Sequence, residues 1–184
     1  MGKNRNDPGT RGRVRRRTDS SLFPDEYLDS AYEIKYEAFY KKGMRGVIFD
    51  IDNTLVPHGA PADERAVRLF KKLHGMGFET MVLSNNKEPR VKSFAEAVET
   101  AYLYKAGKPK RRGYRQAMER MGTDERTTLF VGDQLFTDVW GARRSGIYAV
   151  LVKPIHPKEE IQIVLKRYLE KVVLYFYQRS LRKG

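Results

Sequence analysis

Cysteine is absent from the 184 residues, and so is any long apolar run. Without cysteine the chain can form neither disulfide bonds nor thiolate metal sites. No apolar stretch is longer than 172–177, which is far shorter than the roughly 20 residues that a membrane-spanning helix needs. No apolar stretch follows the first charged residues, which argues against a secretory signal. We therefore expect a cytoplasmic protein.

Positive charge is unevenly distributed along the chain, whose formal net charge is +13. Segments 1–20, 105–126 and 153–184 each carry an excess of five positive charges, and the remainder is nearly neutral. The first of these segments has almost no aliphatic side chains, so we expect a disordered basic arm at 1–20. This distribution favours an anionic partner, either a membrane surface or nucleic acid. The alternative is a soluble protein that is merely basic.

Short apolar stretches alternate with segments of helical spacing from residue 46 onward. We expect strands at 46–50, 78–83, 102–104, 127–131 and 147–152. We expect helices between them at 63–74, 91–98, 112–121 and 136–145. This alternation predicts one α/β domain over 21–184, Rossmann-like, with a parallel sheet and helices on both faces. A further helix start is expected at Pro24-Asp25-Glu26, with Pro in the first turn and acids near the helix dipole.

Polar and reactive residues follow four of the expected strands. They are Asp50, Ser84, Lys108 and Asp133. Parallel α/β sheets bind their ligands at the carboxyl ends of the strands, so we expect these four side chains to share one site.

Two carboxylates two residues apart, Asp50 and Asp52, form the most informative pair. A carboxylate can attack phosphorus and form an aspartyl-phosphate. A second can give a proton to the leaving group and later take one from the attacking water. Two negative groups beside a phosphate require a cation, and oxygen ligands indicate Mg²⁺. Acids at a strand end are common, however, so this pair alone is weak support for an enzyme.

The other strand ends strengthen the same interpretation. Ser84 offers a hydroxyl to phosphate oxygens, although alone it would be an ordinary helix cap. Lys108 can neutralise charge on a transferring phosphoryl group, although alone it would be a surface lysine. Asp133 adds an acid for the metal, and Asp138 can brace the site or begin a helix.

These four motifs, in this order on four strand ends, resemble those of the haloacid dehalogenase (HAD) superfamily over residues 46–150. The resemblance implies Asp50 as the nucleophile, Asp52 as the acid and base, and Mg²⁺ as the cofactor. Its phosphate-binding residues would be Asn53, Thr54, Ser84, Asn85 and Lys108, with Lys105 a less favoured substitute for Lys108. Its metal ligands would be Asp50, the Asp52 carbonyl and Asp133, with Asp138 behind them.

Neither interval between the motifs has room for a folded cap domain. One helix and a strand fill 52–84, and a helix and a short strand fill 84–108. Small-substrate enzymes commonly need closure to exclude water, so an open site suits a substrate presented by a membrane or macromolecule.

A closer resemblance rests on several segments together, and it runs from about residue 22 to 175. The segments are Leu22-Phe23-Pro24-Asp25-Glu26-Tyr27, Phe49-Asp50-Ile51-Asp52-Asn53-Thr54-Leu55, Lys108-Pro109 and Gly132-Asp133-Gln134-Leu135-Phe136-Thr137-Asp138. They look like the YqeG family of HAD subfamily IIIA phosphatases, which is related to phosphatidylglycerophosphate phosphatases. The relation implies a lipid headgroup as substrate, phosphatidylglycerophosphate. The alternatives are a soluble phosphomonoester, such as a nucleotide or sugar phosphate, and a nucleic-acid- or ribosome-associated protein that keeps the fold.

Two basic segments fit an anionic membrane surface. Lys110, Arg111 and Arg112 follow Lys108 after a single proline, so we expect them at the rim of the site. From there they would contact the inner face of an anionic membrane. The C-terminal segment has helical apolar spacing with basic residues between, as in an interfacial amphipathic helix. Its apolar positions are Ile161, Val164, Leu165, Tyr168, Leu169, Val172, Tyr175 and Phe176. We expect 161–169 to pack on the domain, with Tyr175, Phe176 and Tyr177 as candidates for interface contact.

Overall fold

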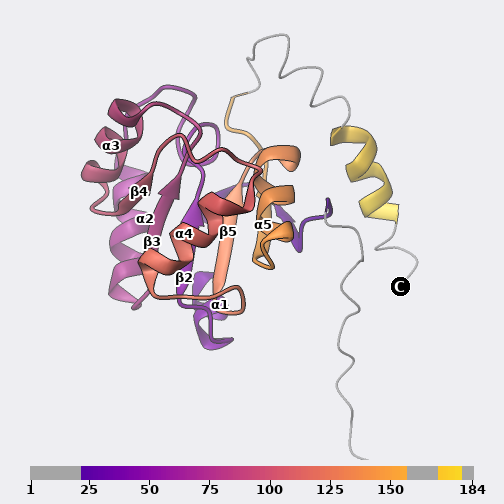
Figure 1. The fold of residues 1–184 in the computed structure, drawn as a ribbon, viewed down its shortest axis with the longest axis horizontal. Coiled ribbons are helices and arrows are strands. Elements are labelled where there is room, and N and C mark those ends of the chain that lie inside the picture. Colours follow the sequence, from indigo (N-terminus) through magenta and orange to yellow (C-terminus); the bar gives the residue numbers. More distant parts are fainter. Residues whose placement is uncertain (1–21, 157–169, 180–184) are drawn as a thin grey trace, which may run out of the picture.

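A single parallel sheet of six strands forms the centre of the molecule, seen in a computed structural model that describes residues 22–156 and 170–179 (Figure 1). The strands are β1 (Glu26–Leu28), β2 (Gly46–Phe49), β3 (Glu79–Leu83), β4 (Ala101–Leu103), β5 (Thr128–Gly132) and β6 (Tyr148–Val152). They lie in the order β1-β6-β5-β2-β3-β4, and every neighbouring pair is parallel. The sheet is open. From β2 the chain adds β3 and β4 on one side, and then β5 and β6 on the other side of β2.

Helices cover both faces of this sheet (Figure 1). One face carries α1 (Tyr36–Lys41), α2 (Glu64–Gly75) and α3 (Glu88–Ala97), and the other carries α4 (Arg111–Met121) and α5 (Trp140–Arg144). A 3-10 turn, η1 (Ala31–Glu33), precedes α1, and a π-helical turn, η2 (Leu135–Val139), runs directly into α5. Residues 170–179, the last that the structure describes, are helical. The α/β class, the parallel sheet and the two helical layers predicted from the sequence are confirmed.

Side chains of the strands alternate between two apolar cores. In β2, Val47 and Phe49 belong to the core under α1, α2 and α3, whereas Ile48 belongs to the core under α4 and α5. All three are completely buried. A strand covered on both faces needs apolar residues at every position, which explains why its sequence reads as an unbroken apolar run.

The helix start predicted at Pro24-Asp25-Glu26 is wrong, because Glu26 begins strand β1. Both Asp25 oxygens lie within 2.7 Å of Arg143 Nη1, and Asp25 Oδ2 also accepts a hydrogen bond from the Ala149 amide. Asp25 therefore attaches the strand to α5 and β6 and does not cap a helix. Tertiary pairing overrides the local signal here, because β1 pairs with β6, which lies more than a hundred residues later in the chain.

The predicted helix 136–145 is two elements. Residues of η2 form a π-turn, in which the Val139 amide bonds the Gln134 carbonyl, and α5 follows. Wider turns of this kind are frequent at functional sites. This one carries Asp138.

No cap domain interrupts the described part of the chain. Only a loop and α2 lie between β2 and β3, and only α3 lies between β3 and β4. The absence of a cap, predicted from the spacing of the motifs, is confirmed for residues 22–156.

The C-terminal helix packs against the same face as α5. Val173 and Leu174 contact the core under α4 and α5, and the rings of Tyr177 and Phe23 are 5.4 Å apart. Tyr177 is buried, so it is not available for the interface contact predicted from the sequence, whereas Tyr175 and Phe176 are exposed. The basic arm predicted at 1–20 and the helix predicted at 161–169 lie outside the described residues. Among the helices that the structure describes, none has the length and apolarity to cross a membrane.

Candidate active site

Four neighbouring strands bring the predicted site residues together at one edge of the sheet. Asp50 follows β2, Ser84 follows β3, Lys108 follows β4 and Asp133 follows β5. All four are buried, as are Asp52 and Asp138. The site therefore lies at the carboxyl ends of β5, β2, β3 and β4, as the sequence predicts.

A buried lysine bridges two of the acids. The Nζ atom of Lys108 lies 2.6 Å from Asp50 Oδ1 and 2.6 Å from Asp138 Oδ1. The exposed fraction of its side chain is 4%, and those of Asp50 and Asp138 are 9% and 0%. Burial of an ammonium group is costly unless it is paired, so the two carboxylates keep Lys108 charged inside the protein.

Opposing effects act on the pKa values of this group. Burial raises the pKa of Asp50 to about 7; the charge of Lys108 lowers it and that of Asp138 raises it. Burial lowers the pKa of Lys108, but Asp138 and Asp50 together outweigh burial and raise it above its usual value. The lysine is thus a fixed positive charge, and Asp50 can exchange a proton near neutral pH.

Asn85 clamps the loop that carries Lys108. Its side-chain oxygen accepts a hydrogen bond from the Lys108 amide at 2.8 Å, and its side-chain nitrogen donates to the Lys108 carbonyl at 3.1 Å. The sequence-based hypothesis predicts that Asn85 binds the phosphate group of the substrate. In the structure its side-chain atoms hold the Lys108 backbone, and its contact with phosphate stays a prediction.

The segment after β5 is shaped around Asp138. Its Oδ2 atom accepts a hydrogen bond from the Gln134 amide at 3.1 Å. A Cβ atom added to Gly132 would lie 2.5 Å from the same oxygen, so only glycine allows the carboxylate to pass there. The buried Tyr114 on α4 donates to the carbonyl of Thr137 at 2.8 Å and holds the turn from the other side.

Asp52 faces a different set of partners. Its Oδ1 atom accepts hydrogen bonds from the Gly59 amide at 2.8 Å and from Arg90 Nη2 at 2.9 Å, and its Oδ2 atom accepts one from Asn86 Nδ2 at 2.6 Å. Sequence reasoning missed Asn86 and Arg90. Asn86 directly follows the Ser84-Asn85 motif, but Arg90 looks like any other charged residue on the first turns of a helix.

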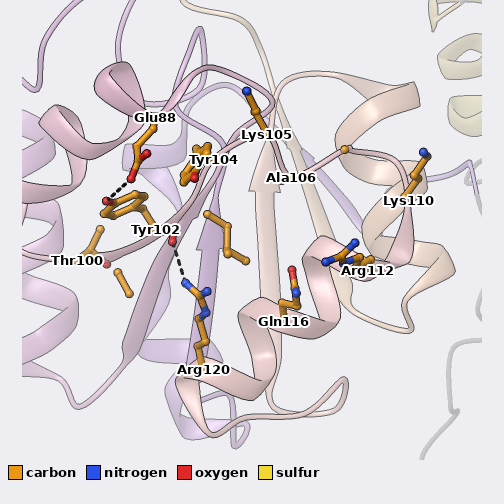
Figure 2. Close-up of a pocket in the computed structure, with 13 residues that line it drawn as sticks. Glu88, Thr100, Tyr102, Tyr104, Lys105, Ala106, Lys110, Arg112, Gln116 and Arg120 are labelled. Carbon is orange, nitrogen blue, oxygen red and sulfur yellow. Dashed lines mark hydrogen bonds between the residues drawn. The ribbon is translucent and has the colours of Figure 1, made fainter.

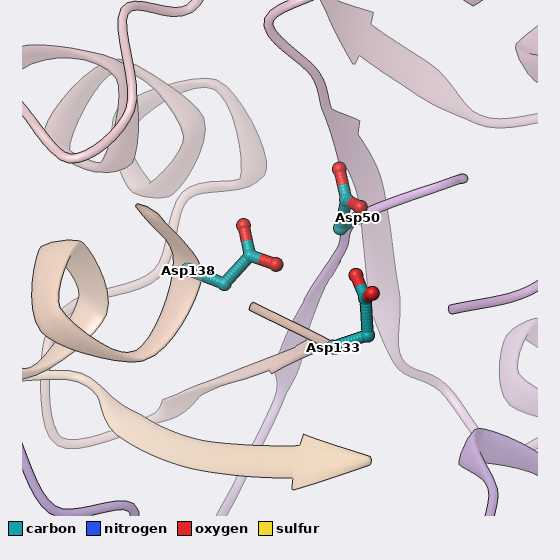
Figure 3. A group of neighbouring side chains, drawn as sticks. All are labelled: Asp50, Asp133 and Asp138. Carbon is teal, nitrogen blue, oxygen red and sulfur yellow. The ribbon is translucent and has the colours of Figure 1, made fainter. Parts of the chain in front are cut away.

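Three carboxylates are close enough to hold a metal ion. One oxygen each from Asp50, Asp133 and Asp138 lies within 4.8 Å of the others (Figure 3). Such oxygen ligands suit a hard cation. Both oxygens of Asp138 already bond protein groups, Lys108 Nζ and the Gln134 amide, which suits a residue behind the ligands. The Asp52 carboxylate is not part of this cluster, and the metal role of its carbonyl stays a prediction.

The remaining predicted phosphate ligands lie beside these acids. The hydroxyl of Thr54 donates to Asp133 Oδ1 at 3.3 Å, and the Ser84 hydroxyl accepts from the Asn86 amide at 3.1 Å. The side-chain oxygen of Asn53 is buried and bonds no group in residues 22–156 or 170–179. A buried polar atom of this kind is typical of a position that contacts an ion, water or ligand. Their contacts with phosphate stay predictions.

A basic groove lies on the other side of the Lys108 loop. It has a volume of about 860 Å³ and runs between the β4 edge and α4 (Figure 2). Its positive lining residues are Lys105, Lys110, Arg112 and Arg120. Lys105 lines this groove, whereas Lys108 contacts the acids, so the structure distinguishes between the two lysines in favour of Lys108.

Comparison with known proteins gives the class of this site. Residues 60–146 match the family model of the haloacid dehalogenase-like hydrolases. The chain is 32% identical over 160 residues to the Bacillus subtilis protein named "Probable phosphatase YqeG", which covers 86% of this chain and 93% of that protein. It is 30% identical over 169 residues to the Arabidopsis thaliana phosphatidylglycerophosphate phosphatase 1, chloroplastic/mitochondrial. That match covers 82% of this chain but only 46% of the plant protein.

Solved structures support the fold alone. A hypothetical protein of Xanthomonas campestris superposes with a TM-score of 0.52 at 16% identity, covering 70% of this chain and 75% of that one. An uncharacterized protein of Listeria monocytogenes serotype 4b superposes with a TM-score of 0.50 at 16% identity, covering 64% and 86%. Fold, site and sequence together define a HAD-type phosphatase. Within that class, the chain belongs to the YqeG family.

Replacement of Arg90 by Gln tests how Asp52 is oriented. The variant loses an ion pair whose two side chains are only 20% and 11% exposed. We expect kcat for phenyl phosphate to fall about tenfold and kcat for p-nitrophenyl phosphate to fall less than threefold. Nitrophenolate leaves without a proton, so a misplaced acid matters less for it. Steady-state kinetics on both substrates gives the ratio.

The matched control is Lys92→Gln on the same helix, since Lys92 forms an exposed pair with Glu96. It should leave both rates unchanged. Equal losses on the two substrates in Arg90→Gln would contradict an effect through Asp52.

Proposed function

We propose that this enzyme is a Mg²⁺-dependent phosphomonoester phosphatase that works through an aspartyl-phosphate on Asp50. The observation that carries the proposal is the buried Asp50 carboxylate, which lies 2.6 Å from the Lys108 ammonium at the carboxyl edge of the sheet. Asp133 is its neighbour in the acidic cluster. A nucleophile needs such a setting, because the positive charge offsets the repulsion between carboxylate and phosphate.

The proposed reaction has two steps on this chain's own residues. An Asp50 oxygen attacks phosphorus, the ester P–O bond breaks, and Asp52 gives its proton to the leaving oxygen. Asp52 then takes a proton from water, whose oxygen attacks the same phosphorus and releases inorganic phosphate. Lys108, Ser84 and Thr54 hold the phosphoryl oxygens, and Asp50 returns to its free form.

Asp50, Asp133 and the Asp52 carbonyl would hold the Mg²⁺ ion. When bound, Mg²⁺ supplies positive charge at the phosphoryl oxygens and orients the group for in-line attack. Asp138 would support this arrangement through Lys108 and the Gln134 amide, the two groups that it bonds.

Replacement of Asp50 by Asn should abolish phosphate release, because an amide oxygen does not attack phosphorus. Beryllofluoride, which mimics the aspartyl-phosphate, should bind the wild type and not the variant. Phosphate release and thermal unfolding measure activity and folding separately. A folded variant that retains more than about a tenth of wild-type turnover would remove Asp50 as the nucleophile.

The binding of Mg²⁺ should depend on pH through Asp50, whose pKa is about 7 without metal. Protons compete with the ion for this carboxylate, so the apparent affinity should fall as the pH falls through 7. Between pH 8 and pH 6 the ionised fraction drops about tenfold, and we expect the same change in the Mg²⁺ midpoint. Thermal-shift titration measures the midpoint, and Asp50→Asn, which lacks the titrating group, should show no such change. An equal midpoint for the wild type at both pH values would contradict the prediction.

For the substrate we propose phosphatidylglycerophosphate, which the enzyme would convert to phosphatidylglycerol at an anionic membrane surface. Three observations support this choice: the name of the plant relative, the site without a cap, and a row of exposed basic residues beside the Lys108 loop. The row consists of Lys110, Arg111 and Arg112, two of which line the groove of Figure 2. Each positive residue near an anionic bilayer contributes about 1 kcal/mol to binding.

The test replaces Lys110, Arg111 and Arg112 together by Glu. Turnover of phosphatidylglycerophosphate in vesicles should fall by about a hundredfold or more at low salt, and less at high salt because of screening. Turnover of p-nitrophenyl phosphate should barely change, since the residues of the reaction are untouched. Phosphate release on both substrates at both salt concentrations gives the comparison.

The matched control makes the same charge change at Lys41, Lys42 and Lys71, which are exposed near the C-terminal ends of α1 and α2, away from the site. It should have a much smaller effect on the lipid substrate. Equal losses on both substrates in the Lys110-Arg111-Arg112 variant would give these residues a general role in catalysis. No loss on either would favour a soluble phosphomonoester as the substrate.

A further inference from the structure

The C-terminal helix, residues 170–179, has two apolar faces, and only one of them packs on the domain. The inner face is the row Glu170, Val173, Leu174 and Tyr177, with spacing i, i+3, i+4, i+7. Val173 and Leu174 contact the core, and Tyr177 is 5% exposed. The outer face is the row Val172, Tyr175, Phe176 and Arg179, with the same spacing.

The outer face is unusually apolar for a surface. Val172, Tyr175 and Phe176 are 50%, 58% and 55% exposed, and they are the three most exposed large hydrophobic residues in the described part of the chain. The exposed basic residues Lys171 and Arg179 lie beside them. The one acid of the helix, Glu170, belongs to the inner face. In Figure 1 the helix, in yellow, stands at one end of the molecule beyond α5, with one side turned away from the sheet.

The inner face of the helix reaches the active-site segment. Glu170 Oε1 accepts a hydrogen bond from the Leu135 amide at 2.9 Å. Leu135 is two residues after Asp133 and is the first residue of the π-turn that carries Asp138. Amide groups in the first turn of a helix lack partners within it, and an acidic side chain is a favourable one. Glu170 therefore supports the segment that positions both acids.

We propose that residues 170–179 dock on an anionic lipid surface and that docking raises turnover through Glu170. A row of Val, Tyr and Phe flanked by Lys and Arg matches the chemistry of a lipid–water interface, where the rings enter the headgroup region and the cations meet lipid phosphates. Most of the stability of a helix in a protein comes from packing of its apolar face, and here one apolar face is exposed. Burial of its outer face in the interface stabilises it and, with it, the contact between Glu170 and Leu135.

The coupling needs no new contact in the site. Docking shifts the helix toward its packed state, and the packed state keeps the segment 133–138 in the arrangement that catalysis uses. Glu170 is a positioning residue in this proposal, because it acts on the site through its hydrogen bond with the Leu135 amide. The inference rests on the catalytic roles proposed for Asp133 and Asp138, and it does not rest on the identity of the substrate.

The experiment uses the full chain, p-nitrophenyl phosphate as a soluble substrate, and vesicles that contain no phosphomonoester. The vesicles are phosphatidylcholine alone, or phosphatidylcholine with about a quarter phosphatidylserine. We expect the wild type to sediment with the anionic vesicles only, and its kcat/KM to rise about fivefold, the lower end of typical coupling between sites.

Two variants separate docking from coupling. The first variant combines Val172→Ser, Tyr175→Ser and Phe176→Ser. It should keep wild-type stability and basal activity, but it should neither sediment with the anionic vesicles nor be stimulated by them. Glu170→Ala should still sediment with the vesicles and lose most of the stimulation, whereas the control Gln178→Ala, exposed on the same helix, should behave as wild type.

Three results would overturn the inference. They are a wild type that anionic vesicles do not stimulate, an outer-face variant that sediments like the wild type, and a Glu170→Ala variant with full stimulation. Failure of the proposed lipid substrate would be seen separately, as absence of phosphate release from phosphatidylglycerophosphate while p-nitrophenyl phosphate is still hydrolysed. Failure of the proposed nucleophile would be seen in a different experiment, as retained turnover of the folded Asp50→Asn variant.

Discussion

The ammonium group of Lys108 between Asp50 and Asp138 is the interaction on which the rest of the site depends. Three segments far apart in the chain meet at this one buried charge. Loss of one partner of such a buried pair typically costs about 3–5 kcal/mol, because the remaining charge cannot reach water. Three features help to bring these groups to hydrogen-bonding distance. They are the hydrogen bonds of Asn85 with the Lys108 backbone, the space left by glycine at position 132, and the hydrogen bond of the Tyr114 hydroxyl.

The same arrangement explains why the site has two electrostatic halves. On one side, Lys108 holds Asp50 and Asp138 with almost no exposure. On the other, Asp52 is oriented by Arg90 and Asn86 from the start of the α3 region. The two carboxylates of one short motif thus have different partners from different strand ends. A division of this kind would let one sequence segment supply both the proposed nucleophile and the proposed acid.

The sequence predicted the sheet and the four strand ends because both follow from local pattern. A buried parallel strand such as β2 is apolar at every position, and the polar residue that follows it stands out. It failed at β1, whose three residues become a strand only by pairing with β6. It also missed Arg90 and Asn86, and it did not foresee the hydrogen bonds between Asn85 and the Lys108 backbone. The contacts of loop and helix side chains depend on how α3 and the Lys108 loop lie in space. The spacing of apolar residues predicted the outer face of the C-terminal helix. It did not predict that Tyr177 packs against Phe23.

The position of β1 has a consequence for how the chain reaches its folded form. It is the first strand of the described chain to leave the ribosome, yet it pairs with β6, the last strand in the part that the structure describes. The strand that is made first at this edge of the sheet can therefore pair only after the strand that is made last has emerged. The nascent protein can build β2, β3 and β4 early, but it must carry β1 unpaired until residue 152 has emerged. Sheet completion thus waits for contacts of very high sequence separation, which are the slow ones in folding.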